Sequence, residues 1–320
     1  MRCQLNWKVP VLVVAFGVLC AGHSFSEDRP ANRFHIYGLT RVEILSTNVP
    51  SARGFYEQSL HTRKDDCSLC DNLPVAPISL NARQALLISK APAQIPTNFI
   101  SEIIFSADNV RVLRRYLKEN KIQIVEPAEN ENRAERYLSV IDPEGHRIGF
   151  TQNVGVPGSK PLVVHSTSLH LIHAGFIVHD RAATEHFYKD ILGFRPYWHG
   201  GMKDDQTDWV SMQVPDGTDW LEFMVNVEPD ADQKLRGIMN HIAIGVTDIH
   251  AEQKKLQDAG VKLTEEPQIG RDGKWQLNLY DPDLTRIEFM ELTPVQKPCC
   301  SEFTGPHPGP QPSSKAPAKP

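Results

Sequence analysis

The chain repeats one pattern of strand and helix, and this repeat limits its possible folds more than any other feature. In the first half, an alternating stretch at residues 39–45 (LTRVEIL) leads into a helical stretch at 51–56 (SARGFY). In the second half, residues 171–178 (LIHAGFIV) lead into 183–188 (ATEHFY), with the same Phe-Tyr pair. Alternation predicts strands, and apolar residues at helical spacing predict helices. The chain is therefore expected to fold as an assembly of repeated units.

A second strand and helix recur in each half. Residues 99–105 (FISEIIF) precede a predicted helix at 110–121. Residues 239–246 (MNHIAIGV) precede a predicted helix at 249–260. The helices close with Asn120 and with Ala259-Gly260, which is typical of helix C-termini.

Each half then ends in further strands with a shared signature. Residues 137–150 read YLSVIDPEGHRIGF, and residues 277–289 read LNLYDPDLTRIEF. Asp-Pro-Glu-Gly predicts a hairpin turn, because Pro fixes φ and Gly tolerates a positive φ. The whole chain therefore contains four modules, two in each half.

This arrangement resembles the vicinal oxygen chelate family, which includes glyoxalase I, extradiol ring-cleaving dioxygenases, fosfomycin-resistance proteins and methylmalonyl-CoA epimerase. The resemblance covers residues 37–152 and 169–292. It implies an α+β fold of two tandem domains, each with two βαβββ modules that form a cup-shaped sheet. In that family the metal ligands lie on the first and last strands of each module.

The second half carries a suitable side chain at each of these four positions: His173, Glu222, His241 and Glu288. Two imidazoles and two carboxylates suit a divalent ion such as Zn²⁺, Ni²⁺, Co²⁺, Mn²⁺ or Fe²⁺. Alternation along each strand directs every second side chain to one face. We therefore predict one divalent metal ion in residues 169–292, bound by these four residues.

The first half lacks this set. Arg41 stands where the first histidine would be, Glu102 replaces the second and Gly149 replaces the last glutamate. Gln84 could ligate only in a shifted register. Residues 37–152 are therefore predicted to be a degenerate, metal-free copy, and an Arg41–Glu102 ion pair in the vacant site is a hypothesis.

Three functions fit this reading. In a glyoxalase-like lyase or isomerase, the metal stabilises an enediolate and a carboxylate moves the proton; Glu288 or Glu222 would be the catalytic base. In an extradiol dioxygenase, Fe²⁺ would be bound by His173, His241 and Glu288. Those enzymes carry a Tyr ten residues before the last glutamate, where this chain has Asn278. The third hypothesis is a non-catalytic small-molecule binding or resistance protein.

A small-molecule substrate is expected in all three cases. Candidate substrate-binding residues are Trp209, Trp220, Asn226, Arg271, Lys274 and Asn278. Residues 198–203 (WHGGMK) are interpreted as a loop that could cover the cup.

The start of the chain predicts export. Arg2 and Lys8, an apolar stretch, and the small residues Ser24 and Ser26 indicate a signal peptide at residues 1–26. Its cleavage would leave no stable membrane span, and the mature protein would be periplasmic or secreted. Disulfides persist in such compartments, but the sequence leaves open how the four mature cysteines pair: Cys67, Cys70, Cys299 and Cys300.

The remaining segments are expected to lie outside the repeats. Residues 153–168 are predicted to be a linker, and residues 293–320, rich in Pro, Ser, Gly and Lys, a disordered tail. The formal net charge of −5 and the lack of a basic stripe give no reason to expect a nucleic-acid partner. Monomer and homodimer both remain open.

Overall fold

The computed structural model describes residues 34–62, 77–125, 136–152 and 169–310. These residues belong to one compact unit, Phe34–Pro320. The predicted signal peptide and linker, together with Cys67 and Cys70, lie outside the described residues. Within the described ranges, no helix is both long and apolar enough to span a membrane.

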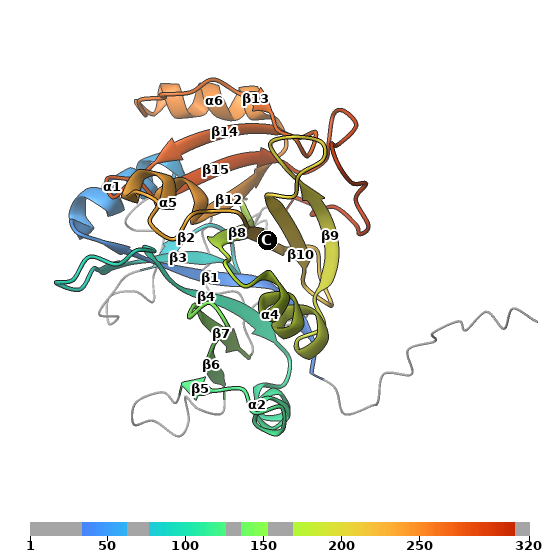
Figure 1. The fold of residues 1–320 in the computed structure, drawn as a ribbon. Helices are drawn as coiled ribbons and strands as arrows, with labels where there is room; N and C mark the ends of the chain where they lie inside the picture. The colour runs from blue at the N-terminus through green and yellow to red at the C-terminus, as the bar shows by residue number, and fades with distance from the viewer. Residues whose placement is uncertain (1–33, 63–76, 126–135, 153–168, 311–320) are drawn as a thin grey trace, which may run out of the picture. The chain divides into compact units, whose positions relative to one another are not determined.

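The described residues of the first half form a seven-stranded sheet and two helices (Figure 1). The strands are β1 (Ile36–Ser46), β2 (Ile78–Ser79), β3 (Ala85–Lys90), β4 (Ile100–Ala107), β5 (Ile124–Val125), β6 (Tyr137–Ile141) and β7 (Arg147–Thr151). The helices are α1 (Val49–Ser59) and α2 (Val110–Glu119). In the order β2-β3-β1-β4-β7-β6-β5, the central pair β1 and β4 is antiparallel, and each has a parallel outer neighbour.

The second half forms an eight-stranded sheet of the order β13-β14-β15-β12-β8-β11-β10-β9. The strands are β8 (His170–Ile177), β9 (Arg195–Gly200), β10 (Trp209–Gln213), β11 (Trp220–Met224), β12 (His241–Val246), β13 (Gln268–Ile269), β14 (Trp275–Tyr280) and β15 (Arg286–Glu291). The helices are α4 (Arg181–Glu185), continued by a π-helical turn (His186–Ile191), α5 (Gln233–Met239) and α6 (Ile249–Asp258). Strands β8 and β12 are the antiparallel central pair, again with parallel outer neighbours. This repetition confirms the predicted α+β fold of two related sheets.

The helices of the repeat begin and end at the residues that local chemistry favours. Asn109 precedes α2 and Asp248 precedes α6, and each side chain accepts a hydrogen bond from the amide three residues on. Such caps satisfy backbone N–H groups that have no partner in the helix. After α2 and α6 the chain turns through positive φ, at Lys121 (60°) and Gly260 (78°). The two helices thus start where the sequence predicts and end two residues earlier.

Both predicted Asp-Pro turns form hairpins, between β6 and β7 and between β14 and β15. In the first turn, Asp142 accepts two backbone hydrogen bonds and Gly145 has a φ of 89°. In the second, Asp281 accepts the equivalent hydrogen bonds, and Leu284 takes a left-handed conformation with φ of 71°. The Asp side chain therefore organises each turn, even where no glycine follows.

The two halves are joined by reciprocal contacts between their repeated motifs. Tyr56 on α1 donates a hydrogen bond to Asp281 Oδ2 in the second half (3.0 Å). Tyr188, its counterpart, donates one to Asp142 Oδ2 in the first half (2.9 Å). Both tyrosines are fully buried. The Phe-Tyr and Asp-Pro motifs are therefore repeated because each half supplies the partner of the other half's tyrosine.

A second reciprocal pair reinforces this junction. Asp283 accepts a hydrogen bond from Ser46 Oγ at the end of β1 (2.6 Å). In the opposite direction, Glu144 Oε1 accepts from the amides of His179 (3.0 Å) and Asp180 (2.6 Å), after β8. The main hydrophobic core also includes buried residues of both halves. The two halves therefore pack as one unit rather than as two independent domains.

The predicted disordered tail is ordered over its first part, which is a correction to the sequence analysis. Residues 293–310, here called the C-terminal strap, follow β15 and pack along β9. The Thr304 amide donates to Tyr197 O (3.0 Å), and Ser301 Oγ donates to His199 O (3.0 Å). Phe303 packs on the Tyr197 ring with a centroid distance of 4.9 Å. The strap is ordered because its aromatic and polar groups find partners on β9, which composition does not reveal.

The strap also contains the disulfide between the adjacent residues Cys299 and Cys300.

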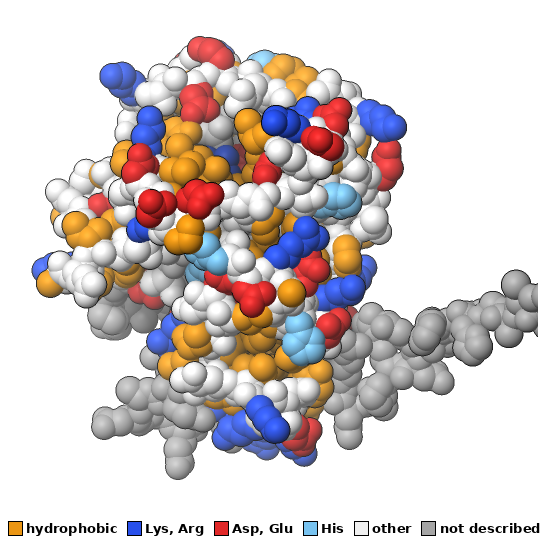
Figure 2. All heavy atoms as spheres, viewed as in Figure 1, with side chains coloured by type: hydrophobic (Ala, Val, Ile, Leu, Met, Phe, Trp, Pro, Cys, Tyr) orange, Lys and Arg blue, Asp and Glu red, His pale blue; other side chains and the backbone are white. Residues whose placement is uncertain are grey.

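On the face shown in Figure 2, Lys and Arg side chains are interspersed with Asp and Glu side chains.

Candidate metal centre

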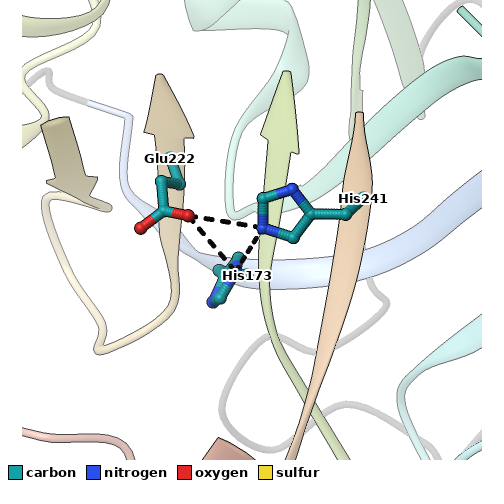
Figure 3. A group of neighbouring side chains, drawn as sticks. All are labelled: His173, Glu222 and His241. Atoms are coloured by element: carbon teal, nitrogen blue, oxygen red, sulfur yellow. Dashed lines mark hydrogen bonds and ion pairs between the residues drawn. The ribbon is translucent and has the colours of Figure 1, made fainter. Parts of the chain in front are cut away.

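Four neighbouring strands, β15, β12, β8 and β11, carry the four predicted ligands. The register places Ala243 beside both His173 and Glu288, and Gly175 beside both His241 and Glu222. Each ligand therefore lies next to a small residue on the adjoining strand, so its side chain has room to extend across the sheet surface. Figure 3 shows His173, Glu222 and His241 pointing toward one another from their separate strands.

The ligand atoms of His173, Glu222 and His241 all lie within 4.8 Å of one another, and Glu288 lies close to both histidines. His173 Nε2 and His241 Nε2 are 3.0 Å apart. Glu222 Oε2 lies 3.3 Å from His241 Nε2 and 4.0 Å from His173 Nε2. Glu288 Oε2 lies 3.5 Å from His173 Nε2 and 3.8 Å from His241 Nε2. Atoms that bind one ion at about 2.0–2.2 Å lie roughly 3–4 Å from one another, so this spacing fits a shared metal ion.

The imidazole of His241 is oriented for ligation. Its Nδ1 lies 2.9 Å from the carbonyl oxygen of Met239, so Nδ1–H donates there and the lone pair of Nε2 faces the other ligands. Such a partner on the second nitrogen is typical of metal-binding histidines. His173 instead packs its ring against Trp220, with a centroid distance of 4.6 Å, and its Nδ1 has no hydrogen-bond partner among the described residues.

Gly175 makes space for this arrangement. A Cβ atom at this position would lie 2.0 Å from His241 Cε1 and 2.7 Å from His241 Nε2. No side chain can therefore occupy position 175 while the imidazole of His241 keeps its place. The absence of a side chain at Gly175 allows β8 and β12 to bring their two histidines together.

Burial keeps both imidazoles neutral. Both are fully buried, and desolvation holds the pKa of His173 well below its usual value and lowers the pKa of His241 to about 3. Burial also raises the pKa of Glu222 and of Glu288, while Arg286 acts in the opposite direction on both. Neutral imidazoles and carboxylates that gain from a nearby cation are what a divalent metal requires.

A pocket of about 260 Å³ opens beside these ligands, and both glutamates line it. Trp198, Trp209 and Met202 form part of its apolar wall, and Arg286 contributes a cation. The arrangement thus places a small-molecule cavity against two carboxylates and two neutral imidazoles.

Residues 170–289 match the family model described as the Glyoxalase/Bleomycin resistance protein/Dioxygenase superfamily. The second half is a vicinal oxygen chelate domain. A lactoylglutathione lyase from Haemophilus influenzae is 27% identical over 125 residues, which cover 38% of this chain and 93% of that protein.

Solved structures similar to this chain extend over both halves. A catechol 2,3-dioxygenase matches with a TM-score of 0.59 and 16% identity, covering 88% of this chain and 97% of that one. A halotolerant catechol dioxygenase matches with a TM-score of 0.58 and 17% identity, covering 86% and 95%. A variant of homoprotocatechuate 2,3-dioxygenase from Brevibacterium fuscum matches with a TM-score of 0.60 and 17% identity, covering 87% and 75%. At these identities the likeness shows a shared tandem fold.

The predicted substrate-binding residues of the vicinal oxygen chelate domain fall into two groups. Trp209 and Arg271 line the pocket. The side chain of Arg271 also donates to Gly201 O (3.0 Å) and pairs with Asp204, so it fixes the loop after β9 at the pocket rim. This loop includes Met202, which is 72% exposed and lines the pocket. Of the predicted covering loop at residues 198–203, residues 198–200 are instead the end of β9, and only residues 201–203 lie in the loop at the pocket rim.

The other four candidates lie elsewhere. Asn226 is exposed and donates to Thr207 O, in a turn outside the pocket lining. Trp220 is buried behind His173, and Asn278 lies beside Glu288 in the register, where it donates to Glu265. None of these three lines the pocket, because strand membership alone does not show which side chains border the cavity; their role in substrate binding stays a prediction.

Lys274 is the fourth. Its ammonium is fully buried in the described structure, where it lies over the rings of Trp220 (4.7 Å), Phe303 (5.0 Å) and Tyr197 (5.6 Å). Desolvation lowers its pKa, while nearby Asp272 acts in the opposite direction. The strap supplies one wall of this aromatic enclosure, and Lys274 is not part of the pocket lining.

In the first half, a polar network occupies the position that corresponds to the metal centre. Glu102 accepts hydrogen bonds from Arg147 Nε (2.9 Å), Ser139 Oγ (3.0 Å) and the Tyr137 hydroxyl. The partner of Glu102 is therefore Arg147 on β7 rather than the hypothesised Arg41. This network contains no histidine.

Gln84 joins the two halves by hydrogen bonds rather than acting as a metal ligand. Its Nε2 donates to Leu39 O (2.9 Å) and to Leu171 O (3.0 Å), and its Oε1 accepts from the Leu171 amide (2.8 Å). Three hydrogen bonds of this buried amide join β1 to β8, and its Oε1 also accepts one from Asn81 Nδ2 (2.7 Å).

Proposed function

We propose that this protein is an exported, metal-dependent enzyme of the glyoxalase-like type, which activates two neighbouring oxygens of a small substrate and moves a proton by a carboxylate. The observation that carries the proposal is the convergence of two carboxylates and two neutral imidazoles at the wall of a cavity. A bound divalent ion would act as a Lewis acid on the oxyanion that forms when the proton leaves.

Glu222 is the better proton carrier of the two carboxylates. Its side chain is 14% exposed, against 3% for Glu288, and its nearest described hydrogen-bond donor, Ser211 Oγ, is 3.5 Å away. A carboxylate with this freedom can turn between the ligand cluster and a substrate in the pocket. Burial raises the pKa of Glu222, which makes it a stronger base near neutral pH. Glu288, more deeply buried, then serves as a fixed ligand.

The proposal is tested first by metal content. The mature chain is expected to bind one divalent ion, and His241→Ala is expected to lose it. The exchange of a carbon-bound proton with D₂O is then followed by NMR on lactoylglutathione, small hydroxyketones and 2-hydroxy acids. Glu222→Gln should slow exchange by about 100-fold or more and retain metal better than Glu288→Gln. Failure to bind metal under any loading condition would refute the central claim.

A ring-cleaving dioxygenase is the second candidate. It is favoured by the group His173, Glu222 and His241, whose ligand atoms all lie within 4.8 Å of one another and offer two imidazoles and one carboxylate. Such a set can hold Fe²⁺ with open positions. Oxygen uptake by iron-loaded protein with catechol, without proton exchange in the other assay, would select this function. Ligand binding without turnover in either assay would select the non-catalytic alternative.

Export is part of the proposal and rests on residues 1–26. Expression of the full chain followed by mass spectrometry of the mature product should show cleavage after Ser26. An intact N-terminus on the folded protein would contradict it.

A further inference from the structure

One cation at the pocket wall has no hydrogen-bond or ion-pair partner among the described residues. Arg286, on β15, lines the pocket together with Glu222 and Glu288. Its Nε is buried, no group of the described residues accepts a hydrogen bond from it, and it forms no ion pair with them. A buried guanidinium donor without an acceptor is costly. A ligand in the pocket is therefore the natural source of the missing acceptor.

The charges around the pocket point to an anion. A divalent ion would balance the carboxylates of Glu222 and Glu288. Lys274 and Asp272 contribute one charge of each sign, and each acts on the pKa of the other, although Lys274 Nζ has no hydrogen-bond partner among the described residues. The guanidinium of Arg286 then remains as one uncompensated positive charge. The loaded site accordingly favours a substrate that carries one negative charge.

The strand register fixes where that charge would lie. Arg286 is the direct neighbour of His241 on the adjoining strand. It also precedes Glu288 by two residues, so both side chains emerge from the same face of β15. An anionic group bound by Arg286 therefore lies next to the ligand cluster, so that one small molecule can contact both.

Apart from Arg271, Asp272 and Gln276, the rest of the pocket wall is apolar. Trp198 and Trp209 stack at 6.4 Å between centroids, and four methionines contribute as well: Met202, Met224, Met239 and Met290. Methionine side chains adjust to irregular apolar groups and interact well with rings. A cavity of about 150 Å³ holds benzene, so about 260 Å³ accommodates a ring or branched chain with a short polar end.

We propose that Arg286 binds the carboxylate of the substrate, and that the site takes small carboxylic acids with an apolar body. The inference rests on the proposed function for the role of the metal, but the guanidinium and the apolar wall are present without it. A bidentate guanidinium–carboxylate pair supplies both charge and geometry.

The test uses two probes that differ in charge alone, 3-phenyllactate and its amide. Their dissociation constants are measured by titration calorimetry on wild-type protein, Arg286→Met and Arg286→Lys, each zinc-loaded and chelator-treated. Arg236→Met is the control: Arg236 lies on α5, donates to Pro229 O, and lies outside this pocket. Circular dichroism and thermal melting verify that each variant folds.

Wild-type protein should bind the acid at least about tenfold more tightly than the amide. Arg286→Met should weaken acid binding by about tenfold to 100-fold, leave amide binding within about threefold, and abolish the preference. Arg286→Lys should retain part of it, and Arg236→Met should behave as wild type. Equal binding of both probes by wild type, no binding of either, or equal weakening of both by Arg286→Met would overturn the inference.

The two proposals can fail separately. If no preparation binds metal, yet chelator-treated protein still prefers the acid through Arg286, the anion site stands and the proposed function falls. If metal binds and proton exchange occurs without any preference for the acid, the proposed function stands and the anion site falls.

Discussion

Replacing Gly175 by alanine should remove the metal while leaving the fold in place. The new methyl carbon would lie 2.0 Å from His241 Cε1. To restore an ordinary contact of at least 3.4 Å, the imidazole has to retreat by about 1.4 Å. Ligand distances in metal sites tolerate only about 0.2 Å, so Nε2 of His241 would leave the coordination sphere.

The expected loss of metal affinity follows from that displacement of the imidazole. Disturbing the support of a ligand commonly lowers metal affinity by about 10–100-fold, and Gly175→Ala should reach the upper end because it moves a ligand directly. The added methyl also overpacks a buried site, which costs about 1–3 kcal/mol of unfolding free energy. Titration against a competing chelator measures the affinity, and thermal melting with and without metal measures the linked stabilisation.

Gly54→Ala is the matched control. Gly54 lies in α1, and a Cβ there would have nothing within 4 Å. Alanine in a helix interior is favoured over glycine by about 1 kcal/mol, so this variant should bind metal as wild type does and melt slightly higher. Near-wild-type metal affinity in Gly175→Ala would refute the reasoning, since the histidine could then reach the ion from another position.

Three further outcomes are expected. Burial raises the pKa of Glu222 and of Glu288, so protons compete with the metal for both carboxylates. Metal affinity should therefore fall as the pH decreases, already above pH 4.5, and metal binding should release protons. A metal affinity that stays the same from pH 5 to 7.5 would contradict this. Tyr56→Phe should lower the free energy of unfolding by about 1–3 kcal/mol in denaturant titrations, because it removes the hydrogen bond to the buried Oδ2 of Asp281; no change would mean that water replaces it. The amide of Thr304 should be protected in hydrogen exchange, whereas rapid exchange would mean that the strap is loose.

The sequence predicted the architecture because the decisive information is local and repeated. Alternation marks β8 and β12, and Asn109 and Asp248 mark the starts of α2 and α6. The Asp-Pro signature marks both hairpins. The four metal candidates were predicted because the family resemblance assigns ligands to strand positions, and the structure brings each glutamate within 4.0 Å of both histidines.

What the sequence could not supply is the environment of each side chain across the sheets. Asn226 follows β11 in the chain, and Trp209 lies on β10, the strand beside β11 in the sheet. Trp209 lines the pocket, whereas Asn226 donates a hydrogen bond within a turn. Glu102 pairs with Arg147 because parallel pairing of β4 and β7 sets them side by side, a register that no local pattern encodes. Arg286 was passed over for a similar reason, since an arginine on a strand is ordinarily solvated.

The reciprocal contacts give the first half a structural role in supporting the second. Tyr188 and the loop after β8 depend on Asp142 and Glu144, which the first half provides at its hairpin. Those positions lie at the turn between β6 and β7, whereas the ligand positions of a metal centre lie along the strands. The support of the second half therefore does not depend on which residues occupy the strand positions of the first. There, the buried Glu102 carboxylate is stabilised by hydrogen bonds from Arg147, Ser139 and Tyr137.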